Sequence, residues 1–148
     1  ALTKASEDEN PFVRTTAAGA LGKIGTAEAK QVLTDLIPTL IDAINDQNLE
    51  IRISSVRALG EIGSLPEQAV PDLIQVLNDP ALSIRKTSIV ALGRMGPSAH
   101  SAVPKRVAVL NSEVKTDNQL QSLVLRALEG IGTPEATTAF QEYQNRTP

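Results

Sequence analysis

A seven-residue motif that occurs four times constrains this chain more than any other feature of its sequence. The motif reads Arg-Ala-Leu-Gly-Glu-Ile-Gly at residues 57–63 and returns, with substitutions, at residues 19–25, 90–96 and 126–132. A single-site enzyme needs its catalytic residues only once, so four copies in 148 residues indicate a repeated structural unit. The motif therefore predicts a repeat architecture and not a ligand-binding loop.

A second pattern describes the other half of each unit. Pro38, Pro71 and Pro104 are spaced 33 residues apart, and each lies within an apolar series at positions i, i+3, i+4 and i+7. This spacing places one apolar stripe along an α-helix. The seven-residue motif belongs to the helix that precedes this proline-containing helix. The last glycine of the motif is expected to end the preceding helix in the left-handed conformation. These glycines are Gly25, Gly63, Gly96 and Gly132.

Residues that favour helix starts precede each motif. The position eleven residues before the motif leucine holds Asn10, Asn48 and Asp117, which are good N-cap residues. The third unit has Ala81 at that position. We therefore expect Asp79 to cap the third helix, with Pro80 as its first residue.

Each unit thus reads as helix, tight turn, helix, and one such hairpin cannot bury its own apolar face. We predict an all-α fold, a right-handed α-α superhelix of about four helical hairpins, in a single domain spanning residues 1–148. The units cover approximately residues 8–45, 46–78, 79–111 and 112–148. Residues 1–7 are expected to be the end of a preceding helix, either a half-helix cap or part of a longer solenoid.

The order Asp-x-Asn-Pro-x-Val-Arg, Ala-Leu-Gly-x-Ile-Gly, Val-Pro-x-Leu-Ile resembles the short HEAT-like repeat, in particular that of E/F-type phycobilin lyases and related bacterial scaffold proteins. The resemblance covers nearly the whole chain and implies a HEAT-like solenoid. It also implies a ladder of contacts between successive units, formed by Asp8, Arg14, Asp46, Arg52, Asp79 and Arg85. Lys115 and Gln121 replace the ladder residues in the last unit, which is typical of a C-terminal cap.

Three irregularities interrupt the repeat. Gly25 and Pro38 are 13 residues apart, whereas the equivalent distance is 8 in the next two units, so five extra residues should lengthen the second helix by about one turn, with a kink at Pro38. Phe12 stands where the other units have polar residues, and we expect it to cover exposed surface at the N-terminal end of the stack. Arg106 stands in a core column, where its stem either lies over the last layers or contacts an anion together with Lys105.

Composition excludes several kinds of chemistry. The chain has no cysteine and one histidine, His100, so thiolate and multi-histidine metal sites are excluded. His100 lies near Ser98 and Ser101, but no motif supplies an orienting acid or an oxyanion hole, so we expect no catalytic residues. The net charge of −3 and the absence of tryptophan argue against nucleic-acid binding. The sequence contains no apolar run of about 18 residues, so it predicts no membrane span. We expect a cytoplasmic protein.

The remaining candidate is a surface for another protein. The resemblance implies that second helices line the concave face, where partners bind. Outward positions on those helices carry Asp35, Thr39, Asp42, Asp72, Gln75, Lys105 and Arg106. These positions change from acidic or neutral to basic along the chain, so we predict either a graded groove for a protein segment or a merely solvated face.

Two functions follow from this surface. The leading prediction is a non-enzymatic scaffold or adaptor for protein–protein interaction, without a cofactor or a metal. The alternative, from the resemblance, is a phycobilin lyase- or isomerase-like subunit or a pigment-protein handling factor. Such a protein would bind bilin, with Lys105, Arg106 and Tyr143 as the available contacts.

Overall fold

A computed structural model describes residues 1–62, 69–104 and 118–146, and within these ranges every regular element is helical. The elements are α1 (Leu2–Ser6), α2 (Pro11–Ile24), α3 (Ala27–Ala43), α4 (Leu49–Ile62), α5 (Ala69–Val76), α6 (Leu82–Arg94), the 3-10 helix η1 (Gly96–Ala102), α8 (Asn118–Ile131) and α9 (Pro134–Arg146). The predicted all-α stack of helical hairpins is confirmed.

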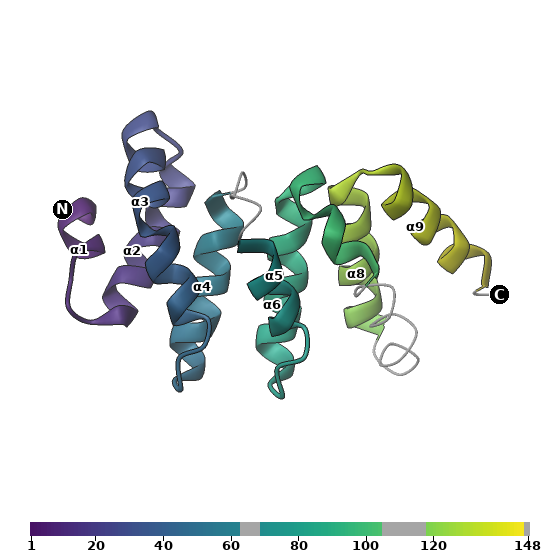
Figure 1. Ribbon diagram of the computed structural model, residues 1–148, viewed down its shortest axis with the longest axis horizontal. Helices are drawn as coiled ribbons and strands as arrows, with labels where there is room; N and C mark the ends of the chain where they lie inside the picture. The colour runs from purple at the N-terminus through teal and green to yellow at the C-terminus, as the bar shows by residue number, and fades with distance from the viewer. Residues whose placement is uncertain (63–68, 105–117, 147–148) are drawn as a thin grey trace.

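The helices form an elongated stack that follows chain order. Figure 1 shows α2, α4, α6 and α8 side by side, with the two termini at opposite ends of the molecule. These four helices, which we call the first helices, pack extensively against one another, whereas α3 and α5 of the other layer contact each other at few positions. The short helix α1 packs mainly on α2. The layer of first helices is therefore the more closely packed of the two.

The core lies between the two layers and is built from aliphatic side chains. Buried leucines come from the motif and from the second helices: Leu21, Leu59, Leu92, Leu128, Leu33, Leu40 and Leu73. Each such side chain contributes roughly 1.5–3 kcal/mol by leaving water. The alanine before the motif leucine is buried in three units, at Ala58, Ala91 and Ala127, and this small side chain lets adjacent helices approach closely.

The predicted N-caps of α2 and α4 are confirmed. The Asn10 side chain accepts a hydrogen bond from the Phe12 N–H at 2.9 Å, and the Asn48 side chain accepts one from the Glu50 N–H at 2.9 Å. Each bond satisfies an amide that the first turn of a helix leaves without a partner. The third predicted cap, Asp117, lies outside the described residues.

The expected start of α6 is wrong. This helix begins at Leu82 with Ala81 at its N-cap, and Pro80 precedes the helix. The Asp79 carboxylate accepts from the Ala81 N–H at 2.8 Å in a turn ahead of the helix. Asp46 makes the same turn before α4, so the repeat register and not the preference of Asp-Pro for helix starts fixes the boundary.

The glycines that end the first helices adopt the conformation expected of them. Gly25, Gly96 and Gly132 have φ angles of 69°, 62° and 66°, which lie in the left-handed region. An L-residue is disfavoured there because its Cβ approaches the following carbonyl. Gly63 falls outside the described residues.

Helix α3 contains the extra residues found in the sequence. It has 17 residues, against 8 in α5, and Pro38 lies inside it, whereas Pro71 lies in the first turn of α5. α3 is longer than α5 as predicted, but by more than the single turn expected, and the kink at Pro38 stays a prediction. Proline in a first turn removes an N–H that has no helical partner, but proline at position 38 removes a bond from the helix interior.

Candidate functional site

The arginines of the proposed ladder hold the turns that precede their helices. In each unit Nη1 donates to two successive backbone carbonyls: Arg14 to Asp8 and Glu9, Arg52 to Asp46 and Gln47, and Arg85 to Asp79 and Pro80, at 2.8–3.2 Å. A guanidinium is suited to this role because it carries several donors in one rigid plane. These arginines stabilise the turns, which explains why they recur at one register.

One contact of the ladder joins two units directly. Arg52 Nε lies 3.2 Å from Asp79 Oδ2, and the two side chains are only 17% and 16% exposed. The contact is an ion pair without hydrogen-bond alignment. Asp79 therefore serves two units, since its other carboxylate oxygen holds the Ala81 amide. Arg14 makes no such ion pair with any residue in the described ranges, and its buried Nε has no hydrogen bond there.

The residues predicted to form the partner site lie on the other layer. Asp35 and Asp42 of α3 and Gln75 of α5 are exposed, while Thr39 and Asp72 are half-buried. Gln75 lines a hollow of about 420 Å³ beside the Arg52–Asp79 pair. Lys105 and Arg106 lie outside the described residues, so the predicted change from acidic to basic along this face stays a prediction.

Groups suited to catalysis are scattered over the described part of the chain. His100 is exposed and lies in η1. In residues 1–62, 69–104 and 118–146, no three histidine or carboxylate side chains come together as a metal site would require. Within the same ranges, no helix combines the length and the apolar character needed to cross a membrane.

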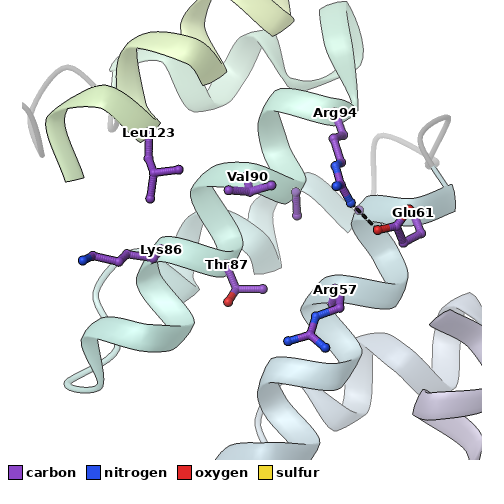
Figure 2. A pocket seen from close by; sticks show the side chains of 9 residues that line it. Arg57, Glu61, Lys86, Thr87, Val90, Arg94 and Leu123 are labelled. Carbon is purple, nitrogen blue, oxygen red and sulfur yellow. Dashed lines mark hydrogen bonds and ion pairs between the residues drawn. The ribbon is translucent and has the colours of Figure 1, made fainter. Parts of the chain in front are cut away.

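A cleft of about 270 Å³ opens on the layer of first helices. Its lining comes from three of them: Arg57, Gly60 and Glu61 of α4, Lys86, Thr87, Val90, Ala91 and Arg94 of α6, and Leu123 of α8. Figure 2 shows these side chains around the same hollow. We call it the first-helix cleft.

A second hollow continues the first-helix cleft toward α8. It shares Val90, Arg94 and Leu123 with that cleft and adds Gly93, Arg126, Ala127 and Gly130. The two hollows therefore form one surface across α4, α6 and α8. Val90 and Leu123 are half-buried, so this surface offers apolar contact between cationic side chains.

Glycines make the floor of this surface. A Cβ placed on Gly60 would lie 2.8 Å from the Ala91 Cα, and one on Gly93 would lie 2.8 Å from the Ala127 Cα. Both distances are far below the ordinary carbon–carbon contact of about 3.5–4.0 Å. The first glycine of the motif thus lets each first helix rest on the next, and it keeps side chains out of the hollow.

The charge of the surface comes mainly from arginine. Arg94 pairs with Glu61 across α6 and α4, and these side chains are 50% and 20% exposed. Arg57 and Arg126 are exposed, and in the described part of the chain neither has a hydrogen-bond or ion-pair partner. This surface was not predicted from the sequence. Its signal was the column Gly19, Arg57, Val90 and Arg126, which varies while the neighbouring motif positions repeat.

Known structures share the fold of this chain at low sequence identity. A crystal structure of an engineered protein aligns with a TM-score of 0.66 and 23% identity, over 97% of this chain and 66% of the other. A designed armadillo repeat protein in complex with the peptide (KR)4 aligns with a TM-score of 0.65 and 19% identity, over 97% of this chain and 69% of the other. Both alignments support a helical-repeat fold.

A search of curated proteins finds no match. The family model for HEAT repeats matches residues 1–38 and 37–112, which is most of the chain. The matched region contains the three arginine-held turns and the close contact at Gly60, so the family pattern coincides with the packing described above. The chain belongs to the HEAT-repeat family.

Proposed function

We propose that this chain is a non-catalytic protein-interaction module that holds a segment of a partner protein across α4, α6 and α8. HEAT- and armadillo-like folds typically serve as scaffolds for protein interaction, and they are typically non-catalytic. The observation that carries the proposal is the continuous surface made by the two hollows, with Val90 and Leu123 at its centre. Apolar contact surrounded by charged side chains is the usual composition of a protein interface.

The packing of the two layers supports the choice of this face. Adjacent first helices meet at glycine, whereas α3 and α5 contact each other at few positions. An extended segment laid across the first helices would contact α4, α6 and α8 at once, because the two hollows are lined by all three.

A few residues of this surface should provide most of the affinity. Binding energy at protein interfaces concentrates in a small number of central residues that lose contact with water. Val90 and Leu123 are central because they line both hollows. The preformed floor at Gly60 and Gly93 lowers the conformational entropy that binding costs, since these helices are already packed.

A peptide selection tests the proposal. Peptides are selected from a random library against the whole chain, and their affinities are measured by fluorescence anisotropy for a Val90→Glu, Leu123→Glu variant. We expect at least about a tenfold loss, because each carboxylate puts a charge where the partner's apolar group must lose water. Circular dichroism checks that the variant keeps its helices.

The matched control changes two charges on the other layer. Asp35→Lys with Asp42→Lys alters exposed residues of α3, so the selected peptides should keep their affinity. If they lose affinity for this variant and keep it for the Val90, Leu123 variant, the second helices are the binding face and our proposal is wrong. That result would support the groove predicted from the sequence.

The bilin-related alternative stays a prediction. Two of its three candidate contacts, Lys105 and Arg106, lie outside the described residues. The third, Tyr143, is half-buried and packs against the core from α9. Mixing the chain with bilin and recording the visible spectrum would test this function, and an unchanged spectrum would remove it.

A further inference from the structure

We infer that the partner segment is acidic and carries an aliphatic side chain at its centre. We also infer that Glu61 competes with the partner's carboxylates for Arg94. This inference rests on the function proposed above and adds the chemistry of the partner. It starts from the charges around the surface across α4, α6 and α8. Three arginines line it against one acidic residue: Arg57, Arg94 and Arg126 against Glu61.

The positive surface contrasts with the rest of the chain. The whole sequence has a net charge of −3, so this local excess of cations is not a property of the composition. Like charges placed close together repel one another, and only an opposing charge or water offsets that repulsion. A partner that brings carboxylates to this surface therefore gains more than one that brings amines.

Two of the arginines are available to a partner. Arg57 and Arg126 are exposed and make no hydrogen bond or ion pair with another described residue. A guanidinium can bind a carboxylate through two parallel N–H···O bonds, which is the strongest common side-chain pairing at a surface. They stand at equivalent positions of α4 and α8, on either side of α6, so their carboxylate partners should flank whatever contacts Val90.

The centre of the surface favours an aliphatic group. Val90 and Leu123 are half-buried and line both hollows, and the floor beside them is glycine and alanine. A leucine-sized side chain would cover these groups and remove apolar area from water. The whole chain has three aromatic residues, and none lines either hollow, so the surface lacks the stacking platforms that single-stranded nucleic acids use.

Glu61 acts as an internal competitor for the partner's carboxylates. It pairs with Arg94 and so occupies the cation that lies between the two hollows. A partner carboxylate must displace Glu61 or do without Arg94. Surface ion pairs contribute about 0.2–1 kcal/mol, which corresponds to a change in affinity of about 1.4-fold to fivefold. Glu61→Gln should therefore bind an acidic partner about 1.4-fold to fivefold more tightly.

Three labelled peptides test the inference with the whole chain. One carries a central leucine flanked by glutamates, one carries lysines in place of the glutamates, and one carries serine in place of the leucine. We expect the glutamate–leucine peptide to bind at least about tenfold more tightly than the lysine peptide, and more tightly than the serine peptide. Its affinity should fall as salt is raised.

Charge variants locate the contact. Arg57→Glu should weaken the binding of the glutamate–leucine peptide by about tenfold or more. Lys30→Glu makes the same charge change at an exposed residue of α3 and should leave the affinity unchanged. Circular dichroism and thermal melting of both variants show whether they are folded. Equal losses for the two variants, or no gain for Glu61→Gln, would overturn the inference.

The outcomes separate this inference from the proposed function. If the lysine peptide binds and is lost in the Val90→Glu, Leu123→Glu variant, the surface binds protein segments but the acidic partner is wrong. If no peptide, selected or designed, responds to that variant, both conclusions fail. Tighter binding of a twelve-nucleotide oligothymidylate than of the glutamate–leucine peptide would mean that the surface recognises polyanions, which would also overturn the inference.

Discussion

The Ser88 hydroxyl donates a hydrogen bond to the Leu73 carbonyl oxygen at 2.7 Å, and both residues are fully buried. This bond joins α6 to the end of α5 in the preceding unit. The Leu77 amide, which a continuing helix would direct to Leu73, bonds to the Ile74 carbonyl instead. The serine therefore serves a carbonyl at a helix end, where helices leave acceptors without partners.

Replacing this serine should destabilise the fold. We expect Ser88→Ala to lower the free energy of unfolding by about 1–3 kcal/mol, because a buried carbonyl loses its donor. Ser55→Ala is the matched control, since the buried Ser55 hydroxyl bonds to the Ile51 carbonyl within its own helix. That change should have an effect within about 0.5 kcal/mol. Urea denaturation of both variants measures the difference, and equal effects would contradict the proposed role of Ser88.

The close contact at Gly60 predicts opposite effects for two glycine substitutions. Gly60→Ala should destabilise the chain by about 1–3 kcal/mol, because the new Cβ meets the Ala91 Cα and only a shift of α4 or α6 can relieve the overlap. Gly19→Ala, in the middle of α2 with open space around it, should stabilise by about 0.5–1 kcal/mol. Thermal melting tests both signs, and a stabilising Gly60→Ala would show that the helices are not in close contact there.

The two roles of the ladder can be separated at Arg52 and Asp79. Arg52→Met removes the bonds to two turn carbonyls and should cost about 2–4 kcal/mol of unfolding free energy. Asp79→Asn keeps the acceptor for the Ala81 amide and removes only the ion pair, which lacks hydrogen-bond alignment, so it should cost less than Arg52→Met. Chemical denaturation compares them. If the two losses are equal, the ion pair and not the turn is the main contribution.

The two prolines of the second helices should respond in opposite directions to alanine. Pro38→Ala restores an N–H inside α3 and should raise the unfolding free energy by about 1–2 kcal/mol. Pro71→Ala, in the first turn of α5, restores no helical bond and should lower it by about 0.4–1 kcal/mol through the greater freedom of the unfolded chain. Both values come from urea titrations, and a destabilising Pro38→Ala would mean that α3 depends on a bend at that residue.

Repetition in the sequence predicted much of this fold because each column of the repeat has one physical task. The motif leucines are buried in every unit, and the last glycines that the structure describes share one backbone conformation. Asn10 and Asn48 both cap their helices, whereas the third unit has Ala81 at that position. The start of α6 was mispredicted because the preference of Asp79-Pro80 for a helix start was given more weight than the register of the column. The repeat register was the better guide, since Asp46 and Asp79 make the same turn.

The first-helix cleft was harder to predict from the sequence. Periodicity shows which positions of a helix face outward, but it does not show which layer is more closely spaced. That spacing depends on how Gly60 meets Ala91 and Gly93 meets Ala127, which are contacts between units. The family resemblance placed the predicted partner residues on the second helices, whereas Arg57, Val90 and Arg126 stand on the first helices.

The glycine contacts between first helices separate stability from recognition along the same stretch of chain. Gly60 holds α4 against α6, while its near neighbours Arg57 and Glu61 face the cleft. Evolution can therefore exchange the residues at 57, 61, 90 and 126 and acquire new partners with little change in how the units stack. Duplication of one unit, such as residues 46–78, would add another set of these positions and extend the binding surface by one helix.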